Sequence, residues 1–282
     1  MPRHPYKKAY IELTSQCNLS CSFCPPLQRP PVFMSQDLLK KSIQESASLC
    51  EELCFHLMGE PSLYPQLEEA FNLANSCDTK VNFTTNGVLI KRVGLVLIKA
   101  KALKQVNFSI HSLVDSSPKW SAILDDIFSF AQELRNARSD VFINFRWWRS
   151  QDGVASEVLS RIIEFYGLKE ISINPEEKSL RLGPRTFLHF ESPFTWPSTS
   201  IPLLQNNGFC HALSKQFGIL CDGRVVPCCL DREGVMSLGN ISEAPLRDIL
   251  ASEEALEIRE GFKRNKLIAQ LCRHCSYIMR FN

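Results

Sequence analysis

The sequence lacks a long hydrophobic run, a strong excess of charge of one sign and a glycine- or proline-dominated composition. No stretch of its 282 residues approaches the roughly 18 consecutive apolar residues that a membrane-spanning helix needs, and its polar start is unlike a secretion signal. Lysine and arginine number 32 against 30 aspartate and glutamate, so the formal net charge is only +2. We therefore expect a cytoplasmic globular protein without a membrane partner, and the charge balance argues against a nucleic-acid substrate.

Cysteine is the residue type that the chain has in excess. Twelve cysteines are several times what packing alone requires, and a reducing cytoplasm argues against a disulfide framework. Metal binding is therefore the first hypothesis for these thiols.

Short β-branched or aromatic runs alternate with helical patterns over most of the chain. Predicted strands cover 9–13, 53–58, 80–84, 105–110, 141–146 and 170–173. Predicted helices cover 35–49, 65–76, 89–100, 120–138 and 154–166. This alternation predicts an α/β fold with a parallel sheet and helices on its faces, in which functional sites gather at the carboxyl ends of the strands.

The pattern breaks after Asn174, where five prolines fall within 28 residues. We expect an irregular linker at 179–209, between a core domain at 1–178 and a small cysteine-rich α+β domain at 210–282. The small domain contains a predicted hairpin, with strands 217–220 and 224–226, and a predicted helix over 245–263. Its apolar residues are too few for a robust core, so we expect bound metal to stabilise it.

Cys17, Cys21 and Cys24 form a C-x3-C-x2-C triplet directly after the first predicted strand. Three thiolates within eight residues can hold one compact metal centre. A zinc ion would need a fourth ligand at zinc-like spacing, which the nearby histidines do not offer. A four-iron cube with three cysteines keeps one iron open for a ligand. We therefore predict a 4Fe-4S cluster; zinc and plain packing are the alternatives.

The triplet, with Phe23 before its last cysteine, resembles the signature of the radical S-adenosylmethionine (SAM) superfamily. The resemblance implies a partial, TIM-like (β/α)6 barrel, a 4Fe-4S cluster on the three cysteines, and SAM bound to the open iron. Residues 58–61, Met-Gly-Glu-Pro, are similar to the superfamily's Gly-Gly-Glu-Pro motif. Gly59 and Glu60 are therefore implied to hold the amino group of SAM, and Met58 replaces the first glycine.

Three further SAM-binding residues are expected at strand ends. Asn86 lies in the Thr-Thr-Asn-Gly run that closes the third predicted strand, and Ser109 ends the fourth. The resemblance implies that Ser109 contacts the ribose or carboxylate of SAM. Arg146 ends the fifth strand and could bind the SAM carboxylate through a two-pronged, charge-assisted contact. The alternative role is a turn former for Asn86, an ordinary strand end for Ser109 and a solvated rim residue for Arg146. The sequence identifies no catalytic residue.

A second cysteine pattern follows near the end of the chain. Cys210 and Cys228 belong to a C-x12-G-x4-C pattern, and Cys272-x2-Cys275 comes later. This resembles the SPASM and twitch domains of one superfamily branch, which bind two or one auxiliary clusters. The tail lacks the C-x2-C-x5-C-x3-C run of the full SPASM version, which favours twitch and one auxiliary 4Fe-4S cluster on these four cysteines. Structural zinc is the alternative metal.

Two more cysteines of the tail, Cys221 and Cys229, compete for the ligand role. Adjacent residues of an extended run face opposite sides, so Cys228 and Cys229 are not both expected on one cluster. The glycine spacing favours Cys228.

The resemblance implies an iron-sulfur oxidoreductase of the dehydrogenase or maturase type, which cleaves SAM to a 5'-deoxyadenosyl radical and takes hydrogen from a substrate. Only eight residues precede the first predicted strand, so we expect no leader-binding domain, and the expected substrate is a small molecule or a short peptide. A reducing protein such as flavodoxin or ferredoxin is the expected partner. The alternatives are a radical SAM enzyme that modifies RNA, and a non-catalytic iron-sulfur or zinc protein that senses redox state or acts as a scaffold.

Overall fold

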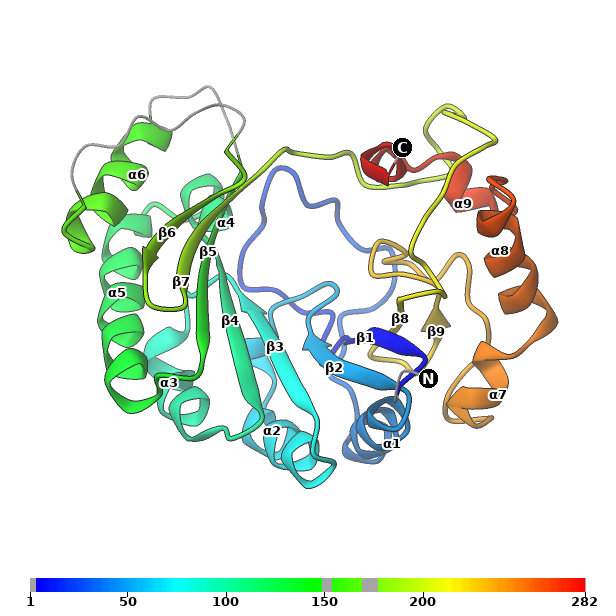
Figure 1. Ribbon diagram of the computed structural model, residues 1–282, viewed down its shortest axis with the longest axis horizontal. Coiled ribbons are helices and arrows are strands. Elements are labelled where there is room, and N and C mark those ends of the chain that lie inside the picture. Colours follow the sequence, from blue (N-terminus) through cyan, green and yellow to red (C-terminus); the bar gives the residue numbers. More distant parts are fainter. Residues whose placement is uncertain (1–3, 149–153, 169–176, 282) are drawn as a thin grey trace.

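The computed structural model describes residues 4–148, 154–168 and 177–281. Within these ranges nine strands form one sheet, in the order β6-β7-β5-β4-β3-β2-β1-β8-β9. Figure 1 shows that the sheet curves into an open crescent, as a partial barrel does. The α/β partial barrel predicted from the sequence is therefore confirmed.

Seven neighbouring strands of the sheet run parallel, and only its two edge strands are antiparallel to their neighbours. The parallel strands are β1 (Tyr6–Ile11), β2 (Cys50–Phe55), β3 (Lys80–Thr85), β4 (Leu103–Ser109), β5 (Phe142–Trp148), β7 (Thr186–Glu191) and β8 (Gln216–Ile219). The edge strands are β6 (Ser179–Gly183) and β9 (Val225–Val226). Because the seven strands share one direction, their carboxyl ends all lie along the same rim of the curved sheet.

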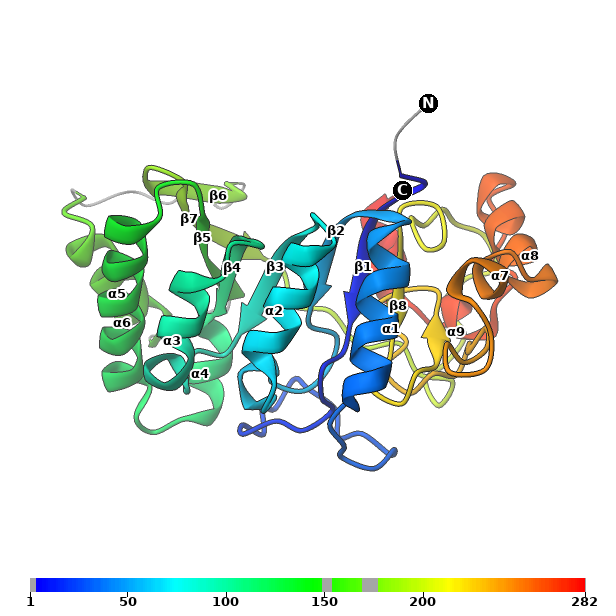
Figure 2. The same ribbon diagram turned by 90° about the horizontal axis from the view of Figure 1, so that it is seen from below.

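Helices cover the convex side of the crescent (Figures 1 and 2). They are α1 (Gln36–Ala47), α2 (Leu67–Ser76), α3 (Ile90–Lys99), α5 (Trp120–Ala137) and α6 (Val154–Phe165). In α1, the Ser35 hydroxyl caps the first turn by accepting from the Leu38 N–H, and Leu39 and Ile43 are completely buried against the sheet. Among the described residues, no helix is both long and apolar enough to cross a membrane.

The tail extends the sheet of the core. Strand β8 pairs in parallel with β1 and forms the predicted hairpin with β9. The tail helices are α7 (Leu246–Leu250), α8 (Glu253–Lys263) and α9 (Gln270–Arg273), followed by the 3-10 helix η2 (Ser276–Phe281). The single helix predicted over 245–263 is therefore two helices. Ser252 begins the second one by accepting from the Ala255 N–H, and this cap separates it from α7.

Two expectations about the middle of the chain need correction. The expected linker contains β6 and β7, joined by a turn at Pro184, because the alternating burial of Thr186–Glu191 suits a strand in spite of the nearby prolines. The strand that pairs in parallel with β5 is β7. The strand predicted at 170–173 lies outside the described residues. The division into 1–178, 179–209 and 210–282 stays a proposal.

Candidate functional site

A cavity of about 480 Å³ lies at the carboxyl ends of the parallel strands. The loop after β1 and the tail both contribute to its wall. Its lining includes two sets of cysteines from distant parts of the sequence: Cys17, Cys21 and Cys24 from the loop, and Cys210, Cys228, Cys229, Cys272 and Cys275 from the tail. The fold therefore brings both predicted cysteine clusters to one space.

The loop that carries the first three cysteines lies inside the concave side of the crescent (Figure 1). Its two ends are held together by the Ser15 N–H, which donates to the Val32 carbonyl at 3.1 Å, and by the Val32 N–H, which donates to Ser15 Oγ at 2.8 Å. Near its tip, the Asp115 carboxylate accepts from the Ser22 N–H at 2.6 Å and from Ser22 Oγ at 2.5 Å. Asp115 belongs to α4 (Ile110–Ser116), a short helix that the sequence analysis missed.

The three loop thiols are suited to a shared metal cluster. Burial, and then repulsion from Cys21 and Cys17, raise the pKa of Cys24 to about 11. Such repulsion means that the three thiols lie near one another, and a cationic centre bound to them would remove it. Among the described residues, no three His, Cys, Asp or Glu side chains converge as the ligands of one metal ion do. A four-iron cube instead binds each thiolate at a separate iron.

Gly59 lies directly against the cysteine loop. Its φ is +69°, and a Cβ at this position would come within 2.2 Å of the Thr14 carbonyl oxygen, so the site requires glycine. Met58, which replaces the first glycine of the motif, is buried in a small cluster with Leu220 and Val226 of the tail. The unusual methionine therefore connects the end of β2 to the tail hairpin.

Glu60 joins the ends of two strands and contacts the cysteine loop. Its carboxylate accepts from the Ser62 N–H at 3.0 Å, from Thr85 Oγ1 at 2.7 Å and from the Asn86 N–H at 2.7 Å. Its own N–H donates to the Gln16 carbonyl at 2.7 Å. Burial raises the pKa of Glu60, and these hydrogen bonds oppose that effect. A carboxylate has about four acceptor positions, so one remains for a ligand.

Asn86 and Ser109 both line the cavity but differ in their contacts. The Asn86 side chain donates to Asn18 Oδ1 at 2.8 Å and accepts from the Val88 N–H at 3.0 Å, so it forms a turn and also supports the cysteine loop. The Ser109 hydroxyl at the end of β4 makes no hydrogen bond to any other described residue. Ser109 is therefore the freer of the two to bind a ligand.

Arg146 makes a two-pronged contact within the protein. Its Nε and Nη2 donate to the two carboxylate oxygens of Glu191 on β7, at 3.0 and 2.8 Å. Against the raising effect of burial, this guanidinium lowers the pKa of Glu191. The sequence analysis missed Glu191 because it expected no strand there. Nδ1 of His111 donates to the Arg146 carbonyl oxygen at 3.2 Å, and the His111 ring stacks on Trp148, so these contacts give His111 a packing role.

Four of the tail thiols lie near one another. Burial, and then repulsion from Cys229, Cys210 and Cys272, raise the pKa of Cys228 well above its usual value. Burial, and then repulsion from Cys210 and Cys275, also raise the pKa of Cys272. The predicted ligands Cys210, Cys228, Cys272 and Cys275 therefore lie within electrostatic range of one another, and all four line the cavity.

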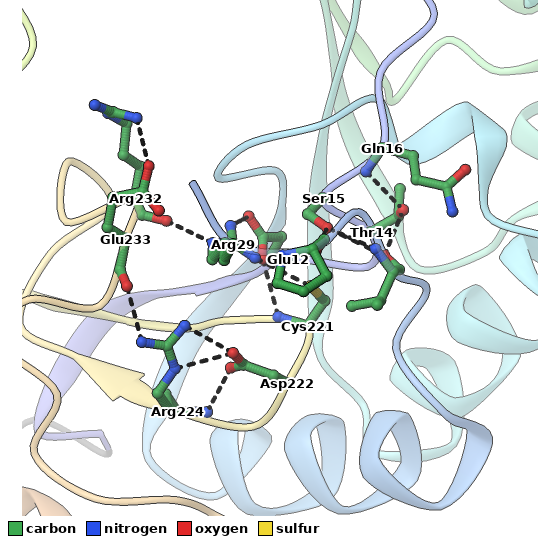
Figure 3. A network of polar contacts seen from close by, with 12 residues as sticks. Glu12, Thr14, Ser15, Gln16, Arg29, Cys221, Asp222, Arg224, Arg232 and Glu233 are labelled. Atoms are coloured by element: carbon green, nitrogen blue, oxygen red, sulfur yellow. Dashed lines mark hydrogen bonds and ion pairs between the residues drawn. The ribbon is translucent and has the colours of Figure 1, made fainter. Parts of the chain in front are cut away.

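The two undecided tail cysteines lie in different places. Cys229 lines the cavity, and burial raises its pKa to about 11 against the lowering effect of a hydrogen bond with the Tyr10 phenol. Cys221 is absent from the described cavity wall. Its N–H donates to Glu12 at 3.0 Å and its sulfur accepts from Arg29 at 3.3 Å, as Figure 3 shows. Cys221 is thus part of a polar network outside the cavity.

Two family models match the chain. The model of the radical SAM superfamily matches residues 11–144, and the SPASM model, described as an iron-sulfur cluster-binding domain, matches residues 210–276. Together these matches cover more than two thirds of the sequence. The chain belongs to the radical SAM superfamily.

Membership of the superfamily confirms which kinds of cofactor the protein binds. A radical SAM domain implies SAM and a 4Fe-4S cluster, and the SPASM match implies auxiliary iron-sulfur binding. The number of auxiliary clusters and the ligands of each cluster stay predictions.

The curated relatives of this radical SAM protein match it over part of their length. A GTP 3',8-cyclase of Aquifex aeolicus (strain VF5) is 33% identical over 117 residues, which are 39% of this chain and 36% of the relative. A GTP 3',8-cyclase of Streptomyces coelicolor is 29% identical over 111 residues, 36% of this chain and 32% of the relative. The matches thus span about a third of these relatives.

Solved structures of similar fold cover nearly the whole chain. SuiB of Streptococcus suis bound to SAM has a TM-score of 0.64 and 17% identity, over 98% of this chain and 74% of SuiB. BtrN in complex with AdoMet and 2-DOIA has a TM-score of 0.60 and 17% identity, over 96% of this chain and 93% of BtrN. At these identities the likeness concerns the fold alone.

Proposed function

We propose that this radical SAM protein reductively cleaves SAM and uses the resulting 5'-deoxyadenosyl radical to oxidise or otherwise modify a short peptide or a small metabolite. The observation that carries the proposal is that both cysteine sets line one cavity. A substrate in this cavity would lie between the SAM-binding cluster and the auxiliary cluster. When bound, the three-thiolate cluster supplies the electron that breaks a carbon-sulfur bond of SAM.

The residues proposed to bind SAM surround the loop cysteines. We assign the cluster to Cys17, Cys21 and Cys24. The backbone carbonyl of Gly59 accepts no hydrogen bond from another described residue, so it is free to accept from the amino group of SAM, beside the remaining acceptor position of Glu60.

The other three proposed SAM contacts differ in what they can offer. Ser109 offers an unused hydroxyl. Asn86 supports the site through Asn18. Arg146 keeps N–H groups beyond the two that Glu191 accepts, and these can reach a carboxylate.

The proposed auxiliary ligands are Cys210, Cys228, Cys272 and Cys275. Four protein thiolates would leave no iron of this cluster open, which supports electron transfer rather than substrate binding as its role. This suits a dehydrogenase or maturase reaction, in which an electron must leave the substrate. A flavodoxin or ferredoxin is the proposed source of electrons for SAM cleavage.

The charge of the cavity wall favours a peptide or neutral metabolite over the nucleoside triphosphate named for the curated relatives. Arg146 is the only lysine or arginine among the described lining residues, and Glu191 neutralises it. A triphosphate carries several negative charges and needs several cationic partners. The structure of SuiB bound to the precursor peptide SuiA, with a TM-score of 0.65, gives a peptide-binding example of the same fold.

The test of the proposed function is anaerobic reconstitution of the chain with iron and sulfide, followed by reduction in the presence of SAM. We expect methionine and 5'-deoxyadenosine, measured by mass spectrometry, and more of both when a peptide fraction of cell extract is added. The triple variant Cys17→Ala/Cys21→Ala/Cys24→Ala should form neither. Reconstituted protein that binds iron yet leaves SAM intact would support the non-catalytic alternative instead.

A further inference from the structure

A second cavity of about 270 Å³ lies where the start of β1 meets the tail. Its wall includes three aromatic rings, two cations and one cysteine: Tyr6, Phe209, Phe262, Arg259, Lys263 and Cys210. Cys210 also lines the main cavity. This proposed ligand of the auxiliary cluster therefore lies between the two cavities.

The segments around the second cavity are strongly basic. Residues 5–7, 209–215 and 259–266 include all of its lining residues, and they contain six lysines and arginines but one carboxylate, Glu260. The whole chain has a formal net charge of only +2. The rest of the chain therefore has a small negative excess, and the positive charge is concentrated around this cavity.

Two of these lysines are connected through the backbone to the residue next to Cys210. The Lys215 N–H donates to the His211 carbonyl at 2.9 Å, and the Lys7 N–H donates to the Lys215 carbonyl at 2.9 Å. Lys7 and Lys215 are both exposed, and neither forms an ion pair with a carboxylate of the described residues. Their charges are therefore available to a partner.

Helix α8 adds an exposed face that is both apolar and cationic. Leu256, Arg259 and Lys263 are spaced by three and four residues, so they lie on one face of the helix. Leu256 is 45% exposed, and the Arg259 guanidinium donates to the Tyr6 hydroxyl at 2.8 Å. Lys263 pairs with Glu260 at 2.6 Å, but both side chains are largely exposed, so this pair is weak.

Apolar surface surrounded by unpaired cations suits an acidic protein partner. The position of Cys210 indicates what that partner does. A substrate that has lost a hydrogen atom keeps one unpaired electron, and its oxidation requires that this electron leave through the auxiliary cluster. Electron-transfer partners need only small interfaces, below about 1,200 Å² in total, and opposite charges speed their encounter.

We propose that the second cavity, Lys7, Lys215 and the exposed face of α8 form one basic surface that docks an acidic one-electron carrier protein. The oxidised carrier gains the electron that the auxiliary cluster loses, so the cluster returns to its oxidised state. This inference rests on the proposed function, because it requires an electron from the substrate. It adds the place where that electron leaves the protein.

The first experiment locates the carrier on the protein. Reconstituted holoenzyme is mixed with oxidised, acidic bacterial flavodoxin and treated with a carbodiimide, which joins carboxylates to lysines in contact with them. We expect cross-links at Lys7, Lys215 and Lys266, identified by mass spectrometry. Lys91 and Lys99 belong to α3, on the opposite arm of the crescent from α8 (Figure 1), and should not react. Cross-links that leave Lys7, Lys215 and Lys266 unmodified would overturn the proposal.

Charge reversal tests the contribution of the two lysines. Lys7→Glu/Lys215→Glu should weaken flavodoxin binding at low ionic strength by about 10-fold, measured by calorimetry, and salt should reduce the difference. Lys91→Glu/Lys99→Glu changes the net charge equally and should bind as the wild type does. Lys7→Gln/Lys215→Gln, a milder change, should give an intermediate affinity. Equal affinities of all variants would refute the docking site.

The triple variant Cys17→Ala/Cys21→Ala/Cys24→Ala separates the electron-transfer step, because it keeps only the auxiliary cluster. After anaerobic reduction and removal of the reductant, it should convert oxidised flavodoxin to the semiquinone in stopped-flow absorbance. Adding Lys7→Glu/Lys215→Glu should slow this conversion several-fold. Flavodoxin that binds without forming semiquinone, or an oligouridine RNA that binds the basic surface where flavodoxin does not, would rule out the carrier.

The proposed function fails separately. It fails when chemically reduced wild-type enzyme leaves SAM intact, whatever flavodoxin does. The docking site fails when SAM is cleaved at the wild-type rate but neither cross-links nor charge reversal identifies the basic surface.

Discussion

The Arg29 guanidinium and the Glu12 carboxylate form an ion pair whose side chains are only 8% and 0% exposed. Glu12 directly follows β1, and Arg29 comes five residues after Cys24. The pair continues into the tail, because the Cys221 N–H donates to Glu12 at 3.0 Å and Arg29 Nε donates to the Arg232 carbonyl at 2.8 Å. Figure 3 shows these contacts. They attach the end of the cysteine loop to tail residues on both sides of Cys228.

Removing one member of this buried pair should destabilise the protein strongly. Arg29→Met leaves Glu12 buried and charged without its partner, and breaking such a pair typically costs about 3–5 kcal/mol. The free energy of unfolding in urea would measure the loss. The matched control is Lys91→Met, because Lys91 is 80% exposed in its 2.8 Å pair with Asp126, and exposed pairs contribute about 0–1 kcal/mol.

A double variant separates loss of the pair from loss of packing. Arg29→Met/Glu12→Leu removes both charges, so it should be more stable than Arg29→Met alone. A double variant as unstable as the single one would show that the guanidinium acts through its contacts with the tail carbonyl and Cys221 rather than through the charge of Glu12.

Iron content tests which cysteines are ligands. Two four-iron cubes predict about eight irons per wild-type chain after anaerobic reconstitution. Cys272→Ala should retain about four and lose stability in the tail, because metal binding contributes to folding there. Cys221→Ser should keep about eight, since Cys221 contacts Glu12 and Arg29 outside the cavity. A wild-type chain with four irons and bound zinc would contradict the auxiliary cluster.

The sequence predicts much of the barrel because β-branched strand runs and amphipathic helices carry local signals. Strands β1 to β5 and the five outer helices correspond to predicted elements within a few residues. Strand β7 was missed, since Pro184 and the prolines after it obscured a short alternating run. Its place in the sheet depends on pairing with β5, which no local pattern shows.

The same limit applies to the site. Cysteine spacing and the Gly59-Glu60 motif are local, so the sequence places them at strand ends that the structure brings to one cavity. Glu191, Asp115 and Arg29 act through partners distant in the sequence, and nothing in their own neighbourhood distinguishes them from surface charges. The Arg146 contact with Glu191 could be found only once β7 was known.

Asp115 should hold the cysteine loop rather than stabilise the whole fold. Against the raising effect of burial, hydrogen bonds from Ser22 lower the pKa of Asp115, so the contact favours the charged carboxylate. Asp115→Asn should therefore release iron to a chelator several-fold faster while Tm changes little, because Asp115 is exposed. Asp126→Asn, on the outer helix α5, serves as the control and should release iron at the wild-type rate. Equal rates in both variants would show that Ser22 needs no anchor.

Gly59 and Gly167 share a backbone conformation but differ in their surroundings. Gly59 has a φ of +69° and Gly167 a φ of +62°. A Cβ on Gly59 would meet the Thr14 carbonyl at 2.2 Å, whereas nothing lies within 4 Å of a Cβ on Gly167. Gly167→Ala should cost only the backbone strain, about 1–2 kcal/mol. Gly59→Ala adds a clash with rigid backbone, so it must displace the loop that carries Cys17. We expect it to lose the SAM-binding iron and the 5'-deoxyadenosine product while Gly167→Ala keeps both. If Gly59→Ala retained full iron and SAM cleavage, the close packing of this motif on the cysteine loop would not position the cluster.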